Sequence, residues 1–471
     1  MIKNFYSVFF CRKESVFMSN CGVYVIHHGA ENYPEFENNC VFSILSGPEG
    51  RYGFRFALRD DTKNNIIEKH DLYSEFTGVY WIWKNRSHDI YGLMHYRSFL
   101  DLNDKKYHPQ NSFLDNLGYN QKRIEEEMSD ADVITSTPMT LQELGTNCLY
   151  DQFCACHPLG EKLFDTCASI IYNSKYDQYM DLGRNFNLHF YGRDQKGYYK
   201  CLTMANKKFF DAYCKFIFFM LDNVYARLKN DIDALPMYRP PFKPGQSQKT
   251  RFRLLAFLAE RLTSLFLYSA IQSGQFRVKT KDRAHYETLN DLLRAHYYPK
   301  GFSIKIPFFR FYCRENHDHL YTTDLDEIQT LGKLGYICEG CMGYALVDRS
   351  QRGGVTDYMA VDVPIFRGWA TNIHDHFYST DTGEFLAAER RNYKRETSPG
   401  WGIEKPVEDT IPVYRFLAHY QNVPDLYHMD HIYTTDQSEP NVIKNAIVDH
   451  EGLLCYLLKN GKTDLIFHGK Y

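Results

Sequence analysis

The sequence lacks a strong charge imbalance. Its 55 lysines and arginines stand against 58 aspartates and glutamates, for a formal net charge of −3. A protein that binds a polyanion through its overall field usually carries a clear excess of positive charge. The balance therefore argues against nucleic acid as a partner. The 44% of hydrophobic and 24% of charged residues are typical of a folded protein.

The sequence also lacks a long hydrophobic run that is free of charge. The longest candidate, residues 253–271, carries Glu260 and Arg261 at its centre, where a bilayer would oppose each charge by roughly 3 kcal/mol. We predict a core helix here. The alternative is a helix on a membrane surface, which would use four basic residues that precede or begin the run: Lys243, Lys249, Arg251 and Arg253.

Regular cysteine spacing is absent as well. The 13 cysteines are scattered, and the two close pairs, Cys154 with Cys156 and Cys338 with Cys341, have no second pair at the distance of a zinc site. Scattered cysteines are typical of reduced thiols, and residues 1–17 lack the small-residue cleavage site of a signal peptide. We therefore expect a cytoplasmic protein, with membrane association as an open alternative.

Two patterns divide the 471 residues into domains. After an N-terminal extension, residues 1–22, short apolar strands alternate with helical stretches over residues 23–282, which predicts an α/β domain. Strands are expected at residues 23–28, 89–96 and 131–138, a helix at 71–85, and a strand running into a helix within 197–225. Residues 283–305 are expected to be a linker.

The remaining part, residues 306–471, contains an internal repeat. Residues 306–327, 363–384 and 411–439 share the pattern Pro-x-[Phe/Tyr]-Arg, a variable turn, Asp-His-x-Tyr-[Thr/Ser]-Thr-Asp and a glutamate. Each copy predicts two antiparallel strands, and the first adds a short helix and a return strand. A repeat of this length indicates stacked or ring-arranged units, so we expect a β-rich domain closed about a pseudo-threefold axis.

One conspicuous motif lies at the end of the second strand. "YWIWKN" ends the predicted helix at Asn85, and "GLMHYR" follows at residues 92–97. These motifs resemble those of a bacterial family of proposed capsular-polysaccharide glycosyltransferases, long catalogued as a domain of unknown function. The resemblance covers about residues 23–270 and includes "LYDQFCACH", which ends at His157.

The resemblance implies a GT-A-like fold that transfers a hexose, with galactose as the expected sugar, from a uridine-diphosphate donor. The partners would be the nucleotide sugar and a glycan or lipid-linked glycan acceptor in surface polysaccharide synthesis. Catalytic roles are expected for His95, Arg97 and Asp101. Donor binding is expected for His27, Lys84, Asn85, Tyr96 and His157.

The residue types agree with that expectation. In an open α/β sheet, ligands bind beyond the carboxyl ends of the strands, where the predicted strand places His95 and Arg97. A guanidinium can pair with a diphosphate through its fork of donors, and an imidazole can hydrogen-bond a phosphate or a hydroxyl. The alternative is that both residues merely cap the strand and join a structural ion pair.

A divalent metal, Mn²⁺ or Mg²⁺, is a further expectation. Many GT-A enzymes hold one with two aspartates at a strand end. Asp130 and Asp132 precede their strand, so Asp101 and Asp104 are the better placed pair, although their spacing is unusual. The chain also departs from the family pattern at Ser98, where an arginine is usual, and at Cys201, where an asparagine is usual.

The repeats resemble a second family, marked by His-Phe-Tyr-Thr-Thr-Asp. Aromatic faces stack on sugars and short polar groups bond to hydroxyls, so the repeats could form three glycan pockets. Alternatively, the same residues close each repeat's turn in the core. Nine residues are expected to bind glycan: His319, Tyr321, Asp324, His376, Tyr378, Asp381, His431, Tyr433 and Asp436. If the α/β domain were inactive, the chain would be a non-catalytic carbohydrate-binding protein.

Overall fold

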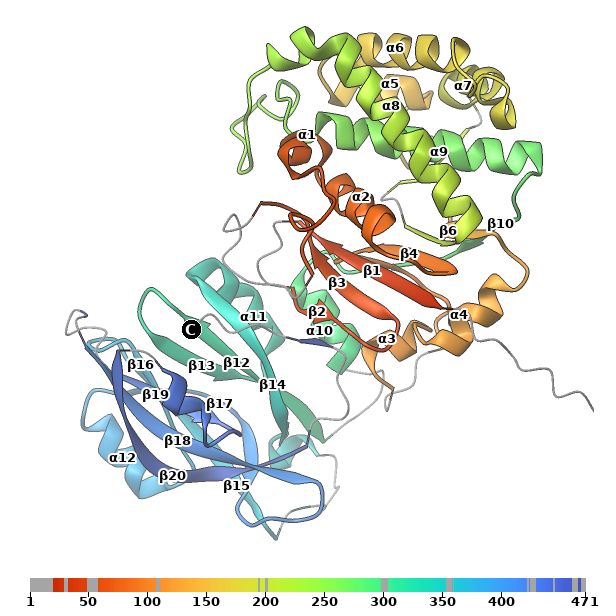
Figure 1. The fold of residues 1–471 in the computed structure, drawn as a ribbon. Helices are drawn as coiled ribbons and strands as arrows, with labels where there is room; N and C mark the ends of the chain where they lie inside the picture. The colour runs from red at the N-terminus through yellow and green to blue at the C-terminus, as the bar shows by residue number, and fades with distance from the viewer. Residues whose placement is uncertain are drawn as a thin grey trace, which may run out of the picture.

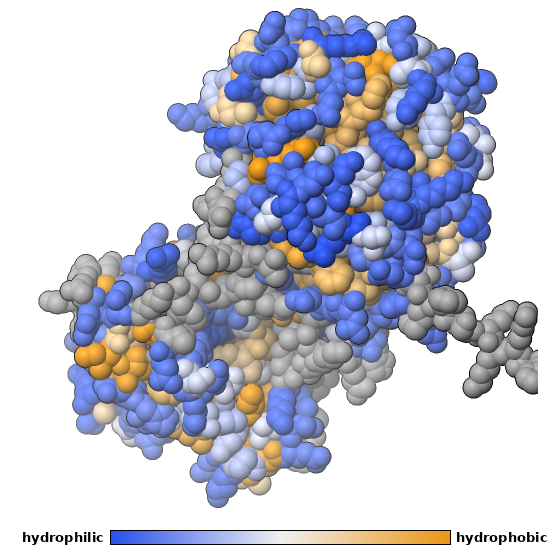
Figure 2. All heavy atoms as spheres, in the orientation of Figure 1, coloured by the Kyte–Doolittle hydropathy of each residue, from blue (hydrophilic) through white to orange (hydrophobic). Residues whose placement is uncertain are grey.

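The computed structural model shows an α/β domain and a β-rich domain (Figure 1). It describes residues 20–28, 33–48, 58–106, 111–193, 195–199, 202–297, 304–352, 358, 360–421, 423, 429–443, 445–459 and 465–466. On the face drawn in Figure 2, hydrophilic side chains dominate and apolar ones gather in small patches.

A mixed sheet forms the centre of the α/β domain. Its order is β10-β6-β9-β4-β1-β3, and β5 pairs with both β4 and β11. β1 is parallel to β3 and β4, whereas β9 is antiparallel to β4 and β6. The strands are β1 (Cys21–His27), β3 (Val41–Leu45), β4 (Ile90–His95), β5 (Ser98–Leu100), β6 (Val133–Ser136), β9 (Thr203–Asn206), β10 (Val278–Lys281) and β11 (Arg283–His285). The three predicted strands are confirmed.

Helices cover the sheet (Figure 1). The layer above the sheet in this view contains α1 (His70–Tyr73), α2 (Phe76–Asn85), α5 (Leu149–Cys156), α6 (Gly160–Tyr172), α7 (Leu182–Tyr191), α8 (Lys207–Asp233) and α9 (Leu254–Ser273). Below it lie α3 (Phe113–Asn116), α4 (Gln121–Met128) and α10 (Leu289–Tyr297). The predicted strand-to-helix transition is β9 into α8, where the Asn206 side chain accepts a hydrogen bond from the backbone N–H of Phe209.

Helix α9 is the apolar run singled out in the sequence. It is the one helix among the described residues that is long and apolar enough to cross a membrane, but 78% of its most apolar window is buried inside the protein. Leu258, Leu262 and Phe266 are among its buried residues. This burial agrees with the prediction of a core helix.

A second hydrophobic core joins the two domains. It contains Val23 and Phe99 from the sheet, Leu292 from α10, and Phe309 and Leu320 from the β-rich domain. The segment predicted as a linker thus contributes β11 to the sheet and α10 to this core. Residues 283–297 pack as part of the protein and do not merely connect two bodies.

The β-rich domain repeats one unit three times. The first unit is β12 (Lys305–Cys313), β13 (Asp318–Thr322), α11 (Leu325–Leu331) and β14 (Tyr336–Leu346). The second is β15 (Asp362–Ala370), β16 (Asp375–Ser379), α12 (Thr382–Glu389) and β17 (Lys394–Ile403). The third is β18 (Thr410–Tyr420), β19 (Met429–Thr434), the 3-10 helix η6 (Glu439–Val442) and β20 (Ala446–Leu458).

Within each unit the strands are antiparallel, and the return strands β14, β17 and β20 each pair with the other two. The predicted helix and return strand of the first copy are confirmed. Two small sheets pair β2 (Glu35–Phe36) with β21 (Leu465–Ile466), and β7 (Met139–Thr140) with β8 (Lys196–Gly197). The other 3-10 helices among the described residues are η1 (Ile67–Lys69), η2 (Tyr179–Asp181), η3 (Gly332–Leu334) and η4 (Arg349–Gln351).

Candidate functional site

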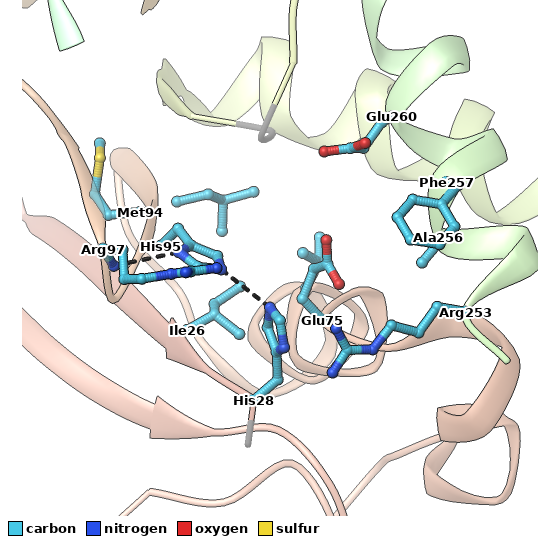
Figure 3. A pocket seen from close by; sticks show the side chains of 12 residues that line it. Ile26, His28, Glu75, Met94, His95, Arg97, Arg253, Ala256, Phe257 and Glu260 are labelled. Carbon is cyan, nitrogen blue, oxygen red and sulfur yellow. Dashed lines mark hydrogen bonds between the residues drawn. The ribbon is translucent and has the colours of Figure 1, made fainter. Parts of the chain in front are cut away.

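A pocket of about 200 Å³ lies at the carboxyl ends of β1 and β4 (Figure 3). These strands are parallel neighbours, with Ile26 opposite His95, so the residues that follow them meet at one edge of the sheet. The polar side chains that line the pocket are His28, Glu75, His95, Arg97, Arg253 and Glu260. The pocket therefore combines imidazole, guanidinium and carboxylate groups.

Two helices direct their N-terminal turns at the pocket. Glu75 is the N-cap residue of α2 and Arg253 that of α9. Both residues line the pocket, and so do Val79 in α2 and Phe257 in α9. The first N–H groups of a helix have no partner within the helix, and the helix dipole is positive there. The pocket therefore has an environment that favours an anion.

The two histidines form a polarised pair. The backbone N–H of Arg97 donates to His95 Nδ1 at 3.2 Å, so the His95 proton lies on Nε2 and is donated to His28 Nε2 at 3.0 Å. The proton of His28 then lies on Nδ1, which is buried and has no hydrogen-bond partner in the described residues. Burial, together with Arg253 and Arg97, lowers the pKa of His28 to about 3. His28 is thus a neutral donor whose Nδ1–H has no acceptor within the part of the chain that the structure describes.

The guanidinium groups supply the positive charge of the pocket. Arg97 Nη1 contacts Glu287 Oε1 at 3.2 Å, a pair in which the glutamate side chain is 69% exposed. Among the described residues, Arg253 has no ion pair, and its guanidinium lies over the ring of Phe252. An exposed ion pair stabilises a protein little, so both arginines remain available to an anionic ligand.

The carboxylates lie on the helical side of the pocket, where Figure 3 shows Glu75 beside the beginning of α2 and Glu260 on α9. Glu260 Oε2 pairs with Arg261 Nη1 at 3.1 Å. The side chain of Glu75 has no hydrogen-bond or ion-pair partner in the part of the chain that the structure describes. Glu75 is therefore the carboxylate that can accept a proton without first breaking an ion pair.

Of the residues predicted for the site, His95 and Arg97 line this pocket, and His157 lines a neighbouring cavity. His27 is buried on the other side of β1, where its Nε2 bonds Ser43 Oγ at 3.1 Å. The ring of Tyr96 packs against those of His27, His28 and His95. Tyr96 therefore packs against the histidines of the pocket and does not line it.

Lys84 and Asn85 are not brought to the pocket. They lie at the C-terminal end of α2, and the pocket contacts the N-terminal end of that helix. Lys84 Nζ lies 3.3 Å from the centre of the Trp83 ring, and the Asn85 amide donates to the carbonyl of Asn64 at 2.8 Å. The structure therefore does not place Lys84 and Asn85 with His95 and Arg97, and their donor-binding role stays a prediction.

The aspartates expected to hold a metal are engaged elsewhere. Asp101 accepts hydrogen bonds from the backbone N–H groups of Asn103 and Lys105 at 3.1 and 2.9 Å. Asp104 pairs with Lys281 at 2.9 Å. Neither residue lines the pocket, so the structure does not bring Asp101 and Asp104 together with His95 and Arg97 around one cavity.

Sequence reasoning did not assign His28, Glu75, Arg253 or Glu260 to the site, although it singled out Arg253 and Glu260 for other reasons. His28 had a usable signal, since it directly follows the first strand and side chains alternate between the faces of a strand. Glu260 had another, as a charge inside an apolar helix. Glu75 and Arg253 gave none, because their positions depend on how α2 and α9 pack over the sheet.

The tyrosines of the repeats are buried. Tyr321, Tyr378 and Tyr433 are 0%, 0% and 1% exposed. The hydroxyl of Tyr378 accepts from the Tyr321 N–H and donates to its carbonyl, both at 2.8 Å, and Tyr433 bonds Tyr378 in the same way. Tyr321 closes the cycle by accepting from the Tyr433 N–H. No ring face is open to a sugar, so the glycan-stacking role expected for these tyrosines is wrong.

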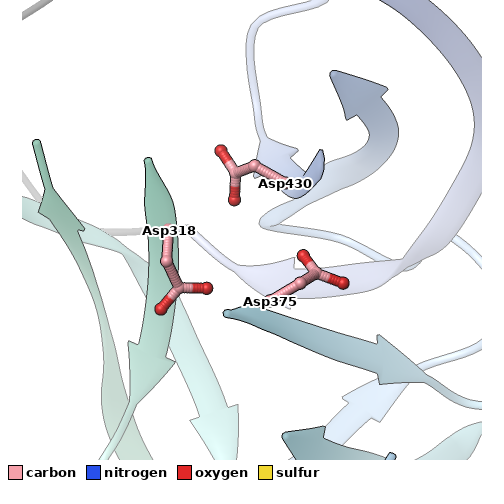
Figure 4. Close-up of side chains that lie close together, drawn as sticks. All are labelled: Asp318, Asp375 and Asp430. Atoms are coloured by element: carbon pink, nitrogen blue, oxygen red, sulfur yellow. The ribbon is translucent and has the colours of Figure 1, made fainter. Parts of the chain in front are cut away.

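The histidines form a second cycle with three buried aspartates that lie together in Figure 4. His376 Nδ1 contacts Asp318 at 2.7 Å, and His431 and His319 contact Asp375 and Asp430 at 2.6 Å. Each aspartate thus holds the histidine of another repeat. His319, His376 and His431 are at most 6% exposed, and they connect repeats instead of facing a glycan.

The last motif aspartates and the arginines also have structural roles. The side chains of Asp324 and Asp381 cap α11 and α12, and Asp436 accepts from the Ser438 N–H at 2.8 Å. In cyclic order, the arginine of each repeat pairs with a glutamate of another: Arg310 with Glu439, Arg367 with Glu327, and Arg415 with Glu384. The whole motif is explained by contacts within and between repeats.

We expect the repeat domain to lose stability as the pH rises. Burial would lower the pKa of His319, but Asp430 and Glu339 outweigh burial and Arg310, and raise the pKa to about 9. An unfolded histidine titrates near 6.5, so the stabilisation is complete below that pH and is lost as the pH rises through 9. The expected loss is roughly 3 kcal/mol.

Hydrogen exchange of the full chain, followed by mass spectrometry at pH 6 and pH 9 with correction for intrinsic exchange, measures this loss locally. The control is His319→Asn, which keeps a donor but carries no titrating charge. Residues 306–458 should lose less protection in the variant than in the parent chain. Equal pH dependence of the two proteins would contradict the charged state of His319.

The comparisons with known proteins assign the α/β domain to a family. The model described as "Domain of unknown function (DUF4422)" matches residues 22–271, more than half of the 471 residues. The chain belongs to this family. A second model, "Domain of unknown function (DUF5648)", matches residues 283–362 and 307–458, the part that contains the repeats. No curated protein matches the chain.

Among solved structures, the chain is similar to one titled as the apo structure of the bifunctional glycosyltransferase WbbM. The identity is 22%, the match covers 61% of this chain and 48% of that one, and the TM-score is 0.46. The chain thus aligns with about half the length of that protein. A likeness this remote supports no argument about activity.

Proposed function

We propose that the protein is a glycosyltransferase with a GT-A-like α/β domain. It moves a hexose, with galactose as the first candidate, from a nucleotide-diphosphate donor to a glycan or lipid-linked glycan in surface polysaccharide synthesis. The family motifs ending in His95 and Arg97 suggest this class of reaction. The observation that carries the proposal is the convergence of two arginines and two helix N-termini on one pocket at the carboxyl ends of β1 and β4.

This convergence suits a diphosphate. Arg97 and Arg253 supply fork-shaped donors for phosphate oxygens, and the first turns of α2 and α9 add backbone dipoles of the same sign. The His28 Nδ1–H is a further donor that has no acceptor among the described residues. A buried polar group without a partner costs roughly 1–3 kcal/mol, so a ligand oxygen at this nitrogen would be favoured.

In the proposed reaction, the bond between the anomeric carbon and the diphosphate oxygen breaks, and the nucleoside diphosphate leaves with the bonding electrons. A hydroxyl oxygen of the acceptor forms the new bond to the anomeric carbon and releases its proton. Glu75 takes that proton, since its carboxylate lines the pocket without an ion-pair partner among the described residues. Arg97 and Arg253 stabilise the negative charge that develops on the leaving group.

A divalent metal is not given a step in this mechanism, because Asp101 and Asp104, the residues expected to bind it, do not fit a site at the pocket. Donor hydrolysis measured with Mn²⁺, with Mg²⁺ and with a chelator tests the metal requirement directly. Equal hydrolysis rates in the three conditions would mean that no divalent metal is required and that the arginines supply the positive charge for the leaving group.

Replacing Arg97 with alanine should weaken donor binding at least tenfold, which is about 1.4 kcal/mol. The variant removes one of the two guanidinium groups of the pocket and leaves its hydrophobic lining intact. Calorimetric titration with a panel of uridine-diphosphate sugars measures the effect. Arg277→Ala is the matched control, because Arg277 is exposed and pairs with Asp132 away from the pocket.

Full donor affinity in Arg97→Ala would mean that Arg97 only caps its strand and pairs with Glu287. Donor binding by the parent chain without turnover on any acceptor would favour the alternative, a non-catalytic carbohydrate-binding protein. Absence of both binding and turnover with every nucleotide sugar would contradict the proposal.

We further infer that the three repeats are related by a pseudo-threefold axis and act as a rigid scaffold. Three cycles of contacts support this arrangement: tyrosine to backbone, aspartate to histidine, and arginine to glutamate. In each cycle, every repeat contacts the other two. The shared core with the α/β domain would then hold this scaffold against the sheet.

For location, we propose a cytoplasmic protein that contacts the membrane through residues 236–251. Residues 236–251 carry four basic residues and no acidic one, and Lys243 and Lys249 are exposed. Exposed basic side chains favour an anionic lipid surface.

Co-sedimentation with phosphatidylglycerol vesicles at low salt should fall at least threefold in the double variant Lys243→Glu and Lys249→Glu, since each basic side chain near such a surface contributes about 1 kcal/mol. Lys122→Glu is the control, because Lys122 is exposed and lies outside residues 236–251. Vesicle binding that is absent, or unchanged by the double variant, would contradict the membrane contact.

A further inference from the structure

A second cavity, of about 330 Å³, adjoins the candidate donor pocket. The two cavities share Arg253 and Phe257 at the beginning of α9. The second one continues along the loop between α8 and α9, with Phe242, Ser247 and Gln248 in its wall. A nucleotide sugar is the substrate of the first pocket in the proposed function, so the neighbouring cavity has no assigned ligand.

The walls of this cavity combine aromatic rings with uncharged polar groups. The rings of His157 and Phe257 stack with centroids 4.5 Å apart and an angle of 24°. Burial, followed by the nearby Arg261, lowers the pKa of His157 to about 4, so this imidazole is neutral at physiological pH. Two stacked aromatic rings therefore line the cavity, and among its described lining residues Arg253, which also lines the donor pocket, carries the charge.

Several residues of the α8–α9 loop that line the cavity are exposed, and two of their polar side chains have no hydrogen-bond partner among the described residues. Phe242 is 39% exposed. In the described part of the chain, the side chains of Ser247 and Gln248 have no hydrogen-bond partner, and both are exposed. A hydroxyl and an amide beside an aromatic ring are the groups that bind a sugar, since the ring packs on its C–H face and the polar groups bond its hydroxyls.

We propose that this cavity binds the acceptor, a neutral pyranose at the growing end of a glycan. The inference rests on the proposed glycosyltransferase function and assigns the second substrate to its own residues. The pyranose lies between Phe242 and the His157–Phe257 stack, with Ser247 and Gln248 on its hydroxyls. One of its hydroxyls then points past Phe257 toward the anomeric carbon of the donor and the Glu75 carboxylate.

The position of the shared residues explains how the two substrates would meet. Arg253 and Phe257 lie one helical turn apart on α9, so they form one edge between the cavities. Both side chains line both cavities; in this proposal Arg253 binds the diphosphate and the ring of Phe257 packs on the acceptor. A sugar held on Phe257 occupies the space through which water would otherwise reach the donor, so acceptor binding should favour transfer over hydrolysis.

The test compares Phe242→Ala with Tyr238→Ala. Both are exposed aromatic residues of the same loop, but Tyr238 does not line the cavity. The probes are methyl glycosides of common hexoses, offered with the nucleotide sugar that the parent chain hydrolyses. Phe242→Ala should raise the KM for the glycoside at least tenfold and lower the ratio of transfer to hydrolysis by a similar factor. Tyr238→Ala should change neither more than twofold.

An independent test uses Cys156, which is exposed and lines the same cavity. Alkylation with N-ethylmaleimide should fill part of the cavity and lower transfer at least tenfold, whereas Cys156→Ser should retain transfer and resist the reagent. Saturation-transfer NMR with the methyl glycosides measures acceptor binding without turnover. Loss of that signal in Phe242→Ala, but not in Tyr238→Ala, is expected.

The outcomes separate the two claims. A parent chain that neither binds nor hydrolyses any nucleotide sugar contradicts the proposed function, and the NMR comparison still decides whether the cavity binds glycosides. The parent chain could instead hydrolyse the donor and transfer its sugar, with a transfer rate that neither Phe242→Ala nor alkylation changes. That result would overturn the acceptor site and leave the proposed function standing.

Discussion

Glu75→Gln should lower the turnover of nucleotide sugar with an acceptor by about 100-fold or more while leaving donor affinity within about threefold. A positioned general base contributes roughly 10² to 10⁴ to the rate, and glutamine keeps the size of the side chain but cannot take the acceptor proton. The measurement is steady-state kinetics of nucleoside diphosphate release, combined with calorimetric titration of the donor. A selective loss of kcat is the expected signature.

Glu68→Gln is the matched control, because Glu68 is an exposed glutamate of the preceding 3-10 helix and does not line the pocket. If Glu75→Gln retained full turnover, the proton would have to pass to another group. Glu260 is then the next carboxylate to replace, since it lines the same pocket from α9.

Tyr378→Ala should destabilise the repeat domain by about 3–5 kcal/mol, the usual cost of removing a large buried aromatic side chain. The ring is fully buried between the other two tyrosines, with centroids 5.4 and 5.2 Å away. Tyr378→Phe keeps the ring but leaves the N–H and carbonyl of Tyr321 without their partner, so it should cost roughly 1–3 kcal/mol.

Hydrogen exchange across residues 306–458 of the full chain measures both variants. Leu453→Ala is the control, because Leu453 is 45% exposed on β20 and its truncation should cost well under 1 kcal/mol. We expect the loss of protection to be largest in Tyr378→Ala, smaller in Tyr378→Phe and smallest in the control. A stable Tyr378→Ala variant would mean that the tyrosine cycle does not hold the repeats together.

Local patterns predicted the strands and the repeats, but not the complete pocket. Residues 89–96 form β4 as expected because a buried strand needs only a short apolar run. His95 and Arg97 were found because they lie at the end of that strand. Glu75 and Arg253 join them across the sequence only after α2 and α9 pack on one face of the sheet, an arrangement that no local spacing specifies.

The repeats show the opposite limitation. The recurrence of Tyr321, Tyr378 and Tyr433 was visible in the sequence. A residue can recur in each repeat because it binds a ligand or because it stabilises the fold, and the sequence does not distinguish the two. The distinction lies in burial, which depends on the meeting of all three units. Asp101 and Asp104 illustrate the same point, because their proximity to the motif did not reveal the lysine and backbone groups that engage them.

The cyclic order of the repeats limits how such a domain can change in evolution. Each aspartate holds the histidine of the next repeat, and the third returns to the first. An open array can gain or lose one unit at its end because each unit contacts only its neighbours. In the closed arrangement, deletion of one unit would leave a buried aspartate and a buried histidine without partners. We therefore expect such domains to keep three units and to vary mainly in the segments between them.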